Sequence, residues 1–263
     1  MLVLANGAFK SGSTWLREIV AAMRPFEPLP AGFHVPRIPS YADPVAVPAL
    51  LASGVPARRN LLAKAHIYAP HLRDALLADP SVRVLNIRRD IRDVLVSHYF
   101  HLSHLGKVSG PFARYYWRLG RLKAQQLLDY HAVWDVSAAN LYAARYESLK
   151  ERFADEVAAV GRFLGVDLDA AAIARIEAAT SLDRLRQRAG QIGHDPRFFR
   201  QGGSGGWAAH FDQRMLDDLR EIEAHGLDRL GRLRYALLFG LRLRLKERLA
   251  HRGGPLATVA ARL

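Results

Sequence analysis

Residues 1–23 read MLVLANGAFKSGSTWLREIVAAM, which joins a short apolar run, a glycine-bearing turn and a helical pattern. The run Met1–Ala5 predicts a buried strand, and the residues after Gly12 predict a helix over Ser13–Met23. Glycines in such a turn let backbone N–H groups face a phosphate, whose negative charge the helix dipole favours. The stretch therefore predicts an α/β protein with an anion site where its first strand ends.

The turn resembles a P-loop in the spacing of Gly7 and Gly12, but its lysine is displaced. A nucleoside triphosphatase has Lys directly after the last glycine, followed by Ser or Thr for the metal. Here Ser13 takes the lysine position and Lys10 lies inside the loop, which argues against ATP hydrolysis and favours another phosphate-bearing donor. A P-loop nucleotide or metabolite kinase stays an alternative that a Mg²⁺ requirement would favour.

The 263 residues suffice for one large α/β domain or two small ones, and half of them are hydrophobic. Cysteine is absent, which excludes a disulfide framework, a thiolate metal site and a catalytic thiol. We expect no signal peptide, because no basic region precedes a long apolar run. No apolar stretch approaches the roughly 20 residues of a spanning helix, so a cytoplasmic protein is expected.

The formal net charge of +13 favours anionic partners such as nucleotides, nucleic acid, acidic polysaccharide or a membrane surface. A basic nucleic-acid-binding module is therefore a further alternative. We expect no nucleic-acid partner, because the chain lacks a helix-turn-helix or RNP signature and its arginines suit a nucleotide site equally well.

Alternating strand and helix patterns predict a mostly parallel central sheet flanked by helices. The expected strands are Met1–Ala5, Leu61–Ile67, Val82–Arg88 and Ala139–Arg145. The expected helices are Ser13–Met23, Pro70–Ala78, Ile91–His104, Phe112–Val136, Ser148–Leu164, Ala170–Ala178, Asp212–Ala224 and Leu227–Ala250. Gln191–Gly206 and the proline-rich Pro25–Pro56 are expected loops. Long loops are often functional, so Pro25–Pro56 is either an acceptor-binding lid or a plain surface excursion.

Two further clusters suit an anion. Arg89 follows a strand at its carboxyl end, where open α/β sheets bind ligands, and Ser97 lies two turns into the next helix, for which Asp90 suits the N-cap. A guanidinium fork and a facing hydroxyl can hold one phosphate together, although a salt-bridged helix start also fits this run. The second cluster, Arg200–Trp207, combines one arginine with four glycines, a pattern that is also typical of flexible turns.

Together these segments resemble the sulfotransferases that use 3′-phosphoadenosine 5′-phosphosulfate (PAPS). Phe9–Trp15 resembles that family's 5′-phosphosulfate loop PKSGTTW, and Arg89–Ser97 resembles its 3′-phosphate motif. Arg200–Trp207 resembles its late motif RKGxxGDW, with Gln201 in place of Lys and Gly206 in place of Asp. These two departures affect how tightly the segment Arg200–Trp207 can hold the 3′-phosphate.

Two shorter segments extend the resemblance over most of the chain. Lys64–His66 resembles the family's KTH, with Ala65 in place of Thr. Tyr146–Leu149, followed by Phe163–Gly165, resembles its YEDL and FLG. Each motif is common alone, but five in the family's order indicate a PAPS-dependent sulfotransferase.

The resemblance implies a P-loop nucleotide-hydrolase-like three-layer sandwich that transfers a sulfuryl group from PAPS to a hydroxyl or amine and leaves PAP. No metal is expected. We expect one sulfotransferase domain over residues 1–228, with a basic C-terminal helix and tail, residues 229–263, packed on it. The donor-binding residues that the resemblance implies are Lys10, Ser11, Gly12, Ser13, Thr14, Trp15, Arg89, Ser97, Tyr146, Thr180, Leu182, Arg200, Gln201 and Gly202.

Three residues are implied to carry the chemistry. Lys10 neutralises the bridging oxygen as its bond to sulfur breaks, and Lys64 orients the group in transit. His66 is the expected general base for the acceptor proton, because a neutral imidazole with a pKa near 6.5 suits that task. A hydrogen-bonded structural histidine is the alternative for His66, since the chain has 11 histidines.

The acceptor is a small molecule or a glycan, and the positive charge favours a carbohydrate or glycolipid that already carries negative charge. Aromatic residues of Pro25–Pro56, such as Phe26, Phe33 and Tyr41, are expected on one wall, with Tyr115–Trp117 opposite.

The segment Arg229–Arg252 has eight Lys and Arg residues against one Glu, with leucines at helical spacing. It predicts a basic amphipathic helix that either packs on the domain or contacts an anionic membrane at its inner face.

Overall fold

The computed structural model describes residues 1–36, 38–192, 194–200 and 202–240. Its centre is a sheet in the order β2-β1-β3-β4, in which every neighbouring pair is parallel. The strands are β1 (Leu2–Gly7), β2 (Leu61–Ala65), β3 (Val82–Arg88) and β4 (Leu141–Arg145). The predicted α/β fold with a parallel sheet is therefore confirmed.

Alternate residues of β1 enter two different cores. Leu2 and Leu4 pack into one core, while Val3 and Ala5 pack into the other, and all four are fully buried. A strand that is covered on both faces has to be apolar at every position, which explains the continuous run at the start of the sequence.

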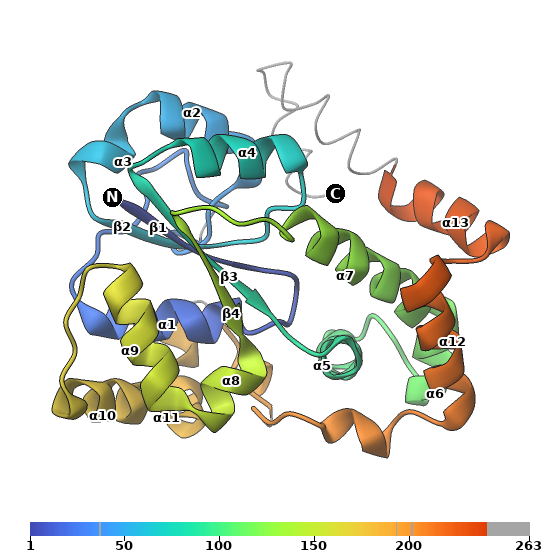
Figure 1. The fold of residues 1–263 in the computed structure, drawn as a ribbon. Coiled ribbons are helices and arrows are strands. Elements are labelled where there is room, and N and C mark those ends of the chain that lie inside the picture. The colour runs from blue at the N-terminus through green and yellow to red at the C-terminus, as the bar shows by residue number, and fades with distance from the viewer. Residues whose placement is uncertain (37, 193, 201, 241–263) are drawn as a thin grey trace.

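Helices cover both faces of the sheet (Figure 1), as a three-layer sandwich requires. One core contains α1 (Ser13–Met23), α8 (Tyr146–Glu151), α9 (Phe153–Phe163) and α10 (Ala170–Ala179). The other contains α2 (Val47–Ala52), α4 (Pro70–Ala78), α5 (Ile91–His104), α7 (Arg121–Val133) and α12 (Gln213–His225).

The expected loop Pro25–Pro56 is more regular than its sequence indicates. It contains a 3₁₀ turn (Pro44–Ala46) and α2, and it leads into α3 (Val55–Arg58). Each of these begins with proline at its first or second position, where the missing N–H costs nothing. Backbone bridges from Glu27 to Leu61 and from Tyr41 to Lys64 extend the sheet beyond β2.

One expected helix contains a π-helical turn and another is divided. Phe112–Val136 is a continuous helix made of α6 (Phe112–Tyr115), a π-helical turn (Tyr116–Gly120) and α7, and it ends at Val133. Ser148–Leu164 is divided into α8 and α9 at Arg152, whose φ and ψ of −133° and 52° are not helical. A short helix, α11 (Leu182–Gln187), begins where Ser181 accepts a hydrogen bond from the Arg184 N–H, and the sequence analysis did not predict it.

The expected C-terminal helix Leu227–Ala250 is described only in part. It begins as α13 (Arg229–Tyr235) and continues as a π-helical turn (Ala236–Gly240). The remainder, including the second half of Arg229–Arg252, lies outside the described residues. No helix in the described part of the chain is long and apolar enough to cross a membrane.

A buried polar network ties the strand ends together. The Asn6 side chain donates to Asn86 Oδ1 at 3.0 Å and to the Tyr130 hydroxyl at 2.7 Å, and that hydroxyl donates to Asn86. Asn6 Oδ1 accepts the Ile67 N–H at 3.0 Å. This network joins β1, β3 and α7 to the residue after His66, and so fixes the carboxyl edge of the sheet.

Candidate active site

The turn between β1 and α1 has two residues with positive φ. Lys10 has a φ of 59° and Gly12 has a φ of 101°. A non-glycine residue in this region stores about 1–3 kcal/mol of strain, which is typical of functional sites. Gly12 is also the N-cap of α1 and provides no capping side chain, so the first N–H groups of α1 have no partner within the helix. The strained turn therefore brings a lysine and an open helix end to one place.

We expect Gly12→Ala to destabilise the protein. A Cβ at this position would lie 2.6 Å from Tyr146 Cδ2, in a backbone conformation that alanine disfavours. Strain and overpacking together cost about 2–5 kcal/mol, which thermal unfolding would report as a Tm lower by roughly 5–15 °C. Gly32→Ala is the matched control, since Gly32 has a φ of 90° but no heavy atom near its Cβ position. Equal losses in both variants would show that the contact with Tyr146 contributes nothing.

One cavity of about 740 Å³ collects nearly all the residues that the sequence analysis assigned to donor binding and catalysis. Those that line it are Lys10, Gly12, Ser13, Thr14, Trp15, Lys64, His66, Arg89, Ser97, Tyr146, Thr180, Leu182, Arg200 and Gly202. Ser11 lies beneath the turn, where its hydroxyl is buried without a hydrogen-bond partner and its N–H donates to the Ala8 carbonyl at 3.2 Å. Gln201 lies outside the described residues.

Asp93 fastens the glycine-rich segment 202–207 to α5. Its buried carboxylate accepts the N–H groups of Gly205 at 2.7 Å and Trp207 at 3.1 Å. Arg89 donates to the Gly203 carbonyl at 2.7 Å and so binds the same segment. The two clusters that the sequence separates by about 110 residues therefore form one wall of the cavity. Asp93 lies within the Arg89–Ser97 motif, but the sequence analysis did not predict its positioning role.

Cations crowd the cavity around the turn. Burial lowers the pKa of Lys10 to about 7, and repulsion from neighbouring cations adds to this effect. Those cations are Lys64, Arg89 and Arg200. The Lys10 ammonium lies 3.5 Å from the centre of the Phe198 ring, a cation–π contact. Such a cluster is stabilised by a ligand with several negative charges, because that ligand relieves the repulsion.

His66 is held so that one ring nitrogen is free to accept a proton. Its Nδ1 contacts the Gly7 carbonyl, which can only accept a hydrogen bond, so Nδ1 carries the hydrogen and Nε2 keeps its lone pair. Burial, with repulsion from Lys64, lowers the pKa of His66 to about 3. The imidazole is therefore neutral at physiological pH, and in the unliganded protein it is a weaker base than the pKa near 6.5 on which its expected role rested. Lys64 lies beside it and donates to Thr14 Oγ1 at 3.3 Å, and burial lowers its pKa to about 8.

A family model described as the sulfotransferase domain matches residues 3–231. The chain belongs to the sulfotransferase family. Solved structures agree with this at the level of the fold. A mouse sulfotransferase complexed with PAP is 17% identical to this chain, with a TM-score of 0.62. The match covers 88% of this chain and 87% of the mouse chain. A retinol dehydratase in complex with androsterone and PAP is 18% identical to this chain, with a TM-score of 0.60. The match covers 87% of this chain and 81% of the retinol dehydratase.

In this sulfotransferase, Trp15 links the turn to the end of α10. Its indole N–H donates to the Thr180 carbonyl at 3.1 Å, and its ring lies edge-on to Tyr146 with centroids 5.4 Å apart. Leu182 is the first residue of α11, and a Cβ at position 202 would contact its side chain. Trp15, Thr180 and Leu182, which are predicted donor-binding residues, therefore lie close together in the cavity, although their role stays a prediction.

Another part of the cavity in this sulfotransferase is aromatic and rich in histidine. Tyr41 packs edge-on against His66, with centroids 5.2 Å apart, and Tyr41 and Ile38 of Pro25–Pro56 line the cavity. His194 stacks on Phe198 at 4.3 Å. The sequence analysis missed Phe198 and His194, because they lie in an expected loop with no periodicity or motif. Of the other predicted acceptor residues, Tyr115 and Tyr116 are buried in the core.

No group of three or more His, Cys, Asp or Glu side chains in the described ranges is arranged to hold a metal ion.

Proposed function

We propose that this protein transfers a sulfuryl group from PAPS to a hydroxyl or amine of an acceptor. The observation that carries the proposal is the crowding of Lys10, Lys64, Arg89 and Arg200 around one cavity at the open end of α1. Two proteins of the same fold were crystallised with PAP, which supports the same donor here.

The donor residues divide into two groups by position. Lys10, Ser13, Thr14 and the first N–H groups of α1 would hold the 5′-phosphate, because they surround the turn. Arg89, Ser97, Arg200 and the Gly202 backbone would hold the 3′-phosphate along the wall that Asp93 fastens. The Ser11 N–H is bonded to Ala8 and is the least available of the predicted loop donors.

The reaction requires one bond to form as another breaks. The acceptor oxygen forms a bond to sulfur while the bond between sulfur and the bridging phosphate oxygen breaks, and PAP leaves with that electron pair. His66 Nε2 takes the acceptor proton, since its Nδ1 is bonded to Gly7. Lys10 stabilises the negative charge on the bridging oxygen in a site where water is excluded, so that its effect exceeds that of a surface lysine. Lys64, which donates to Thr14 Oγ1 at 3.3 Å, orients the group in transit.

PAP binding should take up protons at slightly alkaline pH. The pKa of Lys10 is about 7 in the unliganded protein, and a phosphate beside it raises that pKa. Between these two pKa values Lys10 is neutral when free and protonated when bound, so the affinity for PAP falls as the pH rises through this window. Calorimetry at pH 8 in two buffers of different ionisation enthalpy measures the uptake. Lys10→Met should reduce it, and an unchanged uptake would contradict this assignment.

The acceptor end of the cavity fits a hydroxyl compound with an apolar or aromatic body. Phe9, Ile38, Leu102, Leu105 and Phe198 line it together with neutral histidines. Asp93 and Glu177 are the carboxylates in the described lining, and Asp93 is bonded to the glycine-rich segment. A cationic acceptor is therefore disfavoured, whereas a neutral or anionic one is compatible.

A panel assay of sulfuryl transfer from PAPS tests both the activity and the acceptor class. We expect turnover of apolar phenols and alcohols above that of neutral and acidic saccharides or glycolipids. The carbohydrate or glycolipid that the net charge suggested would be supported if the acidic saccharides reacted faster. No transfer to any acceptor, with PAPS bound, would contradict the proposed activity.

We also propose that α13 contacts an anionic membrane surface. Leu230, Leu233 and Leu237 recur at helical spacing and are 66%, 58% and 54% exposed, and Arg229 and Arg232 are on the same helix. Such a helix binds anionic lipid through buried leucines and basic side chains. The full chain should co-sediment with phosphatidylserine vesicles at low salt and less with phosphatidylcholine vesicles. A Leu230→Ser and Leu233→Ser double variant should lose binding, and no binding by the unchanged protein would exclude this contact.

A further inference from the structure

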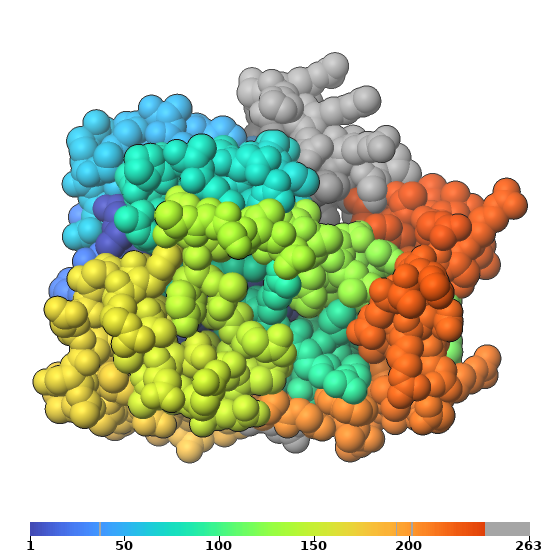
Figure 2. Space-filling view, in the orientation of Figure 1, coloured from blue at the N-terminus to red at the C-terminus, as the bar shows by residue number. Residues whose placement is uncertain are grey.

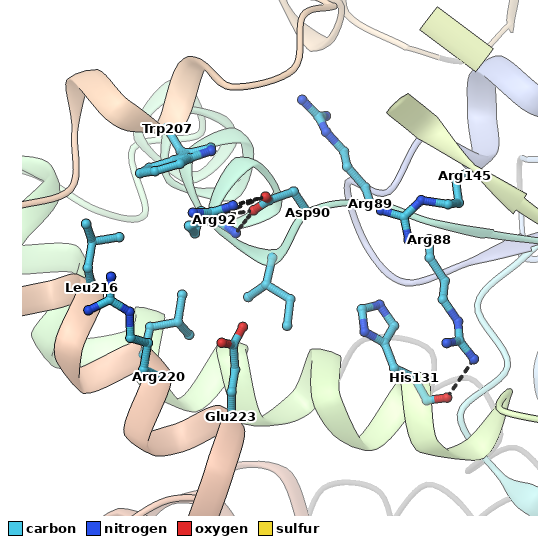
Figure 3. A pocket seen from close by; sticks show the side chains of 12 residues that line it. Arg88, Arg89, Asp90, Arg92, His131, Arg145, Trp207, Leu216, Arg220 and Glu223 are labelled. Atoms are coloured by element: carbon cyan, nitrogen blue, oxygen red, sulfur yellow. Dashed lines mark hydrogen bonds and ion pairs between the residues drawn. The ribbon is translucent and has the colours of Figure 1, made fainter. Parts of the chain in front are cut away.

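A second hollow lies beside the donor cavity, and we call it the arginine cleft. Its volume is about 450 Å³, and it lies between the carboxyl ends of β3 and β4, the start of α5, and the helices α7 and α12. Figure 3 shows Arg88, Arg145 and His131 on one side, with side chains of α12 opposite them. Figure 2 shows the same face, where atoms of α5 are recessed between the β4–α8 segment and α12. Arg89 lines both the cleft and the donor cavity.

The cations of this wall are weakly neutralised by the protein itself. Arg88 donates to the His131 carbonyl at 3.0 Å, and its ion pair with the exposed Asp135 is 3.4 Å long. Arg145 is 67% exposed and lies 3.7 Å from Glu147. Exposed ion pairs at such distances contribute little.

The acidic residues that line the cleft do not neutralise the positive charge of Arg88 and Arg145. Asp90 accepts hydrogen bonds from the Arg92 side chain and from the Arg92 N–H, so the charges of these two residues offset each other. Glu223 and Arg220 lie on α12, on the opposite side from Arg88 and Arg145, and Arg220 is paired with Asp217 at 2.7 Å. The excess of positive charge is therefore at the strand ends.

His131 adds an unsatisfied polar atom to the cationic wall. Its Nε2 is buried and has no hydrogen-bond partner. Burial, with repulsion from Arg88 and Arg145, lowers the pKa of His131 to about 4, so the ring is neutral and can donate one N–H. A buried polar atom without a partner is costly in a folded protein, and a bound acceptor oxygen would satisfy it.

Apart from Arg220 of α12, the remaining lining is apolar. Leu216 of α12 and Trp207 are partly exposed, whereas Ile91 and Leu219 are already buried at 8% and 2% exposure. A hydrated inorganic ion would leave the exposed parts of Leu216 and Trp207 uncovered. An organic body would bury them and gain the hydrophobic contribution.

We propose that the arginine cleft binds a small organic anion. Its negative group lies against Arg88, Arg145 and His131, because guanidinium groups match the oxygens of a carboxylate, sulfate or phosphate ester. Its apolar body covers Leu216 and Trp207. Glu223 and Arg220 both line the α12 side, so the far end offers no net positive charge to a second negative group.

The test uses 2-naphthoate as the probe and the full chain saturated with PAP, which keeps the probe out of the donor site. Calorimetry should show binding to the unchanged protein. Arg145→Gln should weaken it at least ~10-fold, because a charge-assisted hydrogen bond is lost. Arg162→Gln is the matched control, since Arg162 is an exposed arginine of α9 that lines neither the cleft nor the donor cavity.

His131→Phe is a second, independent variant. It keeps the ring but removes the Nε2 donor, so the affinity for 2-naphthoate should fall ~3- to 10-fold, as for one lost hydrogen bond. Unchanged PAP affinity in both variants shows that they are folded. Inorganic sulfate should bind more weakly than 2-naphthoate, because it covers no apolar surface.

Three results would overturn the proposal. Arg145→Gln could bind 2-naphthoate as tightly as the unchanged protein does, or PAP could displace 2-naphthoate. The third is that sulfate binds as tightly as 2-naphthoate. If PAP itself does not bind, the proposed function fails, and the titration of Arg145→Gln without PAP still decides the cleft.

Discussion

His66→Ala should abolish sulfuryl transfer while leaving PAP binding intact. The imidazole is neutral, its Nδ1 is bonded to the Gly7 carbonyl, and its Nε2 lone pair is free for the acceptor proton. Loss of a positioned general base lowers turnover by about 10²–10⁴-fold. The affinity for PAP should change little, because the cations that would hold its phosphates stay in place. Single-turnover transfer from PAPS and calorimetry with PAP measure these two quantities separately.

His71→Ala is the matched control for this variant, since His71 is an exposed histidine on α4. It should retain full turnover. His66→Gln adds a further comparison, because the amide can still donate to Gly7 but is not a base. Near-normal turnover in His66→Ala would remove His66 from this role and leave it a structural histidine that joins β1 to β2.

Lys10→Met should lose both donor affinity and rate. A charged hydrogen bond to phosphate contributes about 1.5–3 kcal/mol, so PAP should bind roughly 10- to 100-fold more weakly. Loss of charge stabilisation at the bridging oxygen should lower the rate of bound PAPS by about 10²–10³-fold. Both values follow from a titration with PAP and from single-turnover rates at saturating PAPS.

Although Lys10→Met should lower donor affinity and rate, it should leave the thermal stability of the protein unchanged or raise it. Folding lowers the pKa of Lys10, so between pH 7 and 10.5 Lys10 is protonated in the unfolded chain and mostly neutral in the native protein. Loss of this proton on folding costs free energy, so Lys10 destabilises the native state. The Tm of the unliganded variant at pH 7 should therefore equal or exceed that of the unchanged protein. A lower Tm together with normal transfer would show that Lys10 is a structural residue held by Phe198.

The sheet and the anion turn are predictable from the sequence because both depend on local chemistry. A run such as Leu2–Ala5 is apolar at every position only if both faces are covered, and the Gly7–Gly12 spacing matches the turn that follows it. The family resemblance placed Arg89 and Arg200 at one site, and both line the same cavity. These features need no knowledge of distant contacts.

Other features depend on contacts that no local pattern reveals. No local pattern marks the π-helical turn at Tyr116–Gly120. Asp93 binds N–H groups more than a hundred residues away. Phe198 reaches Lys10 from a segment without periodicity. The division into residues 1–228 and 229–263 and the cytoplasmic location stay predictions, as does the role of Gln201, which lies outside the described residues.

Isothermal titration of the unchanged protein with PAP and with ATP, both without metal, tests the donor assignment directly. The cations around Lys10 and the wall formed by Arg89 and Arg200 predict that PAP binds at micromolar concentration or below and that ATP binds much more weakly. Absence of PAP binding would contradict the assignment of PAPS as donor. Tight ATP binding that requires Mg²⁺ would favour a P-loop kinase, and tight duplex binding that PAP does not displace would favour a nucleic-acid-binding module.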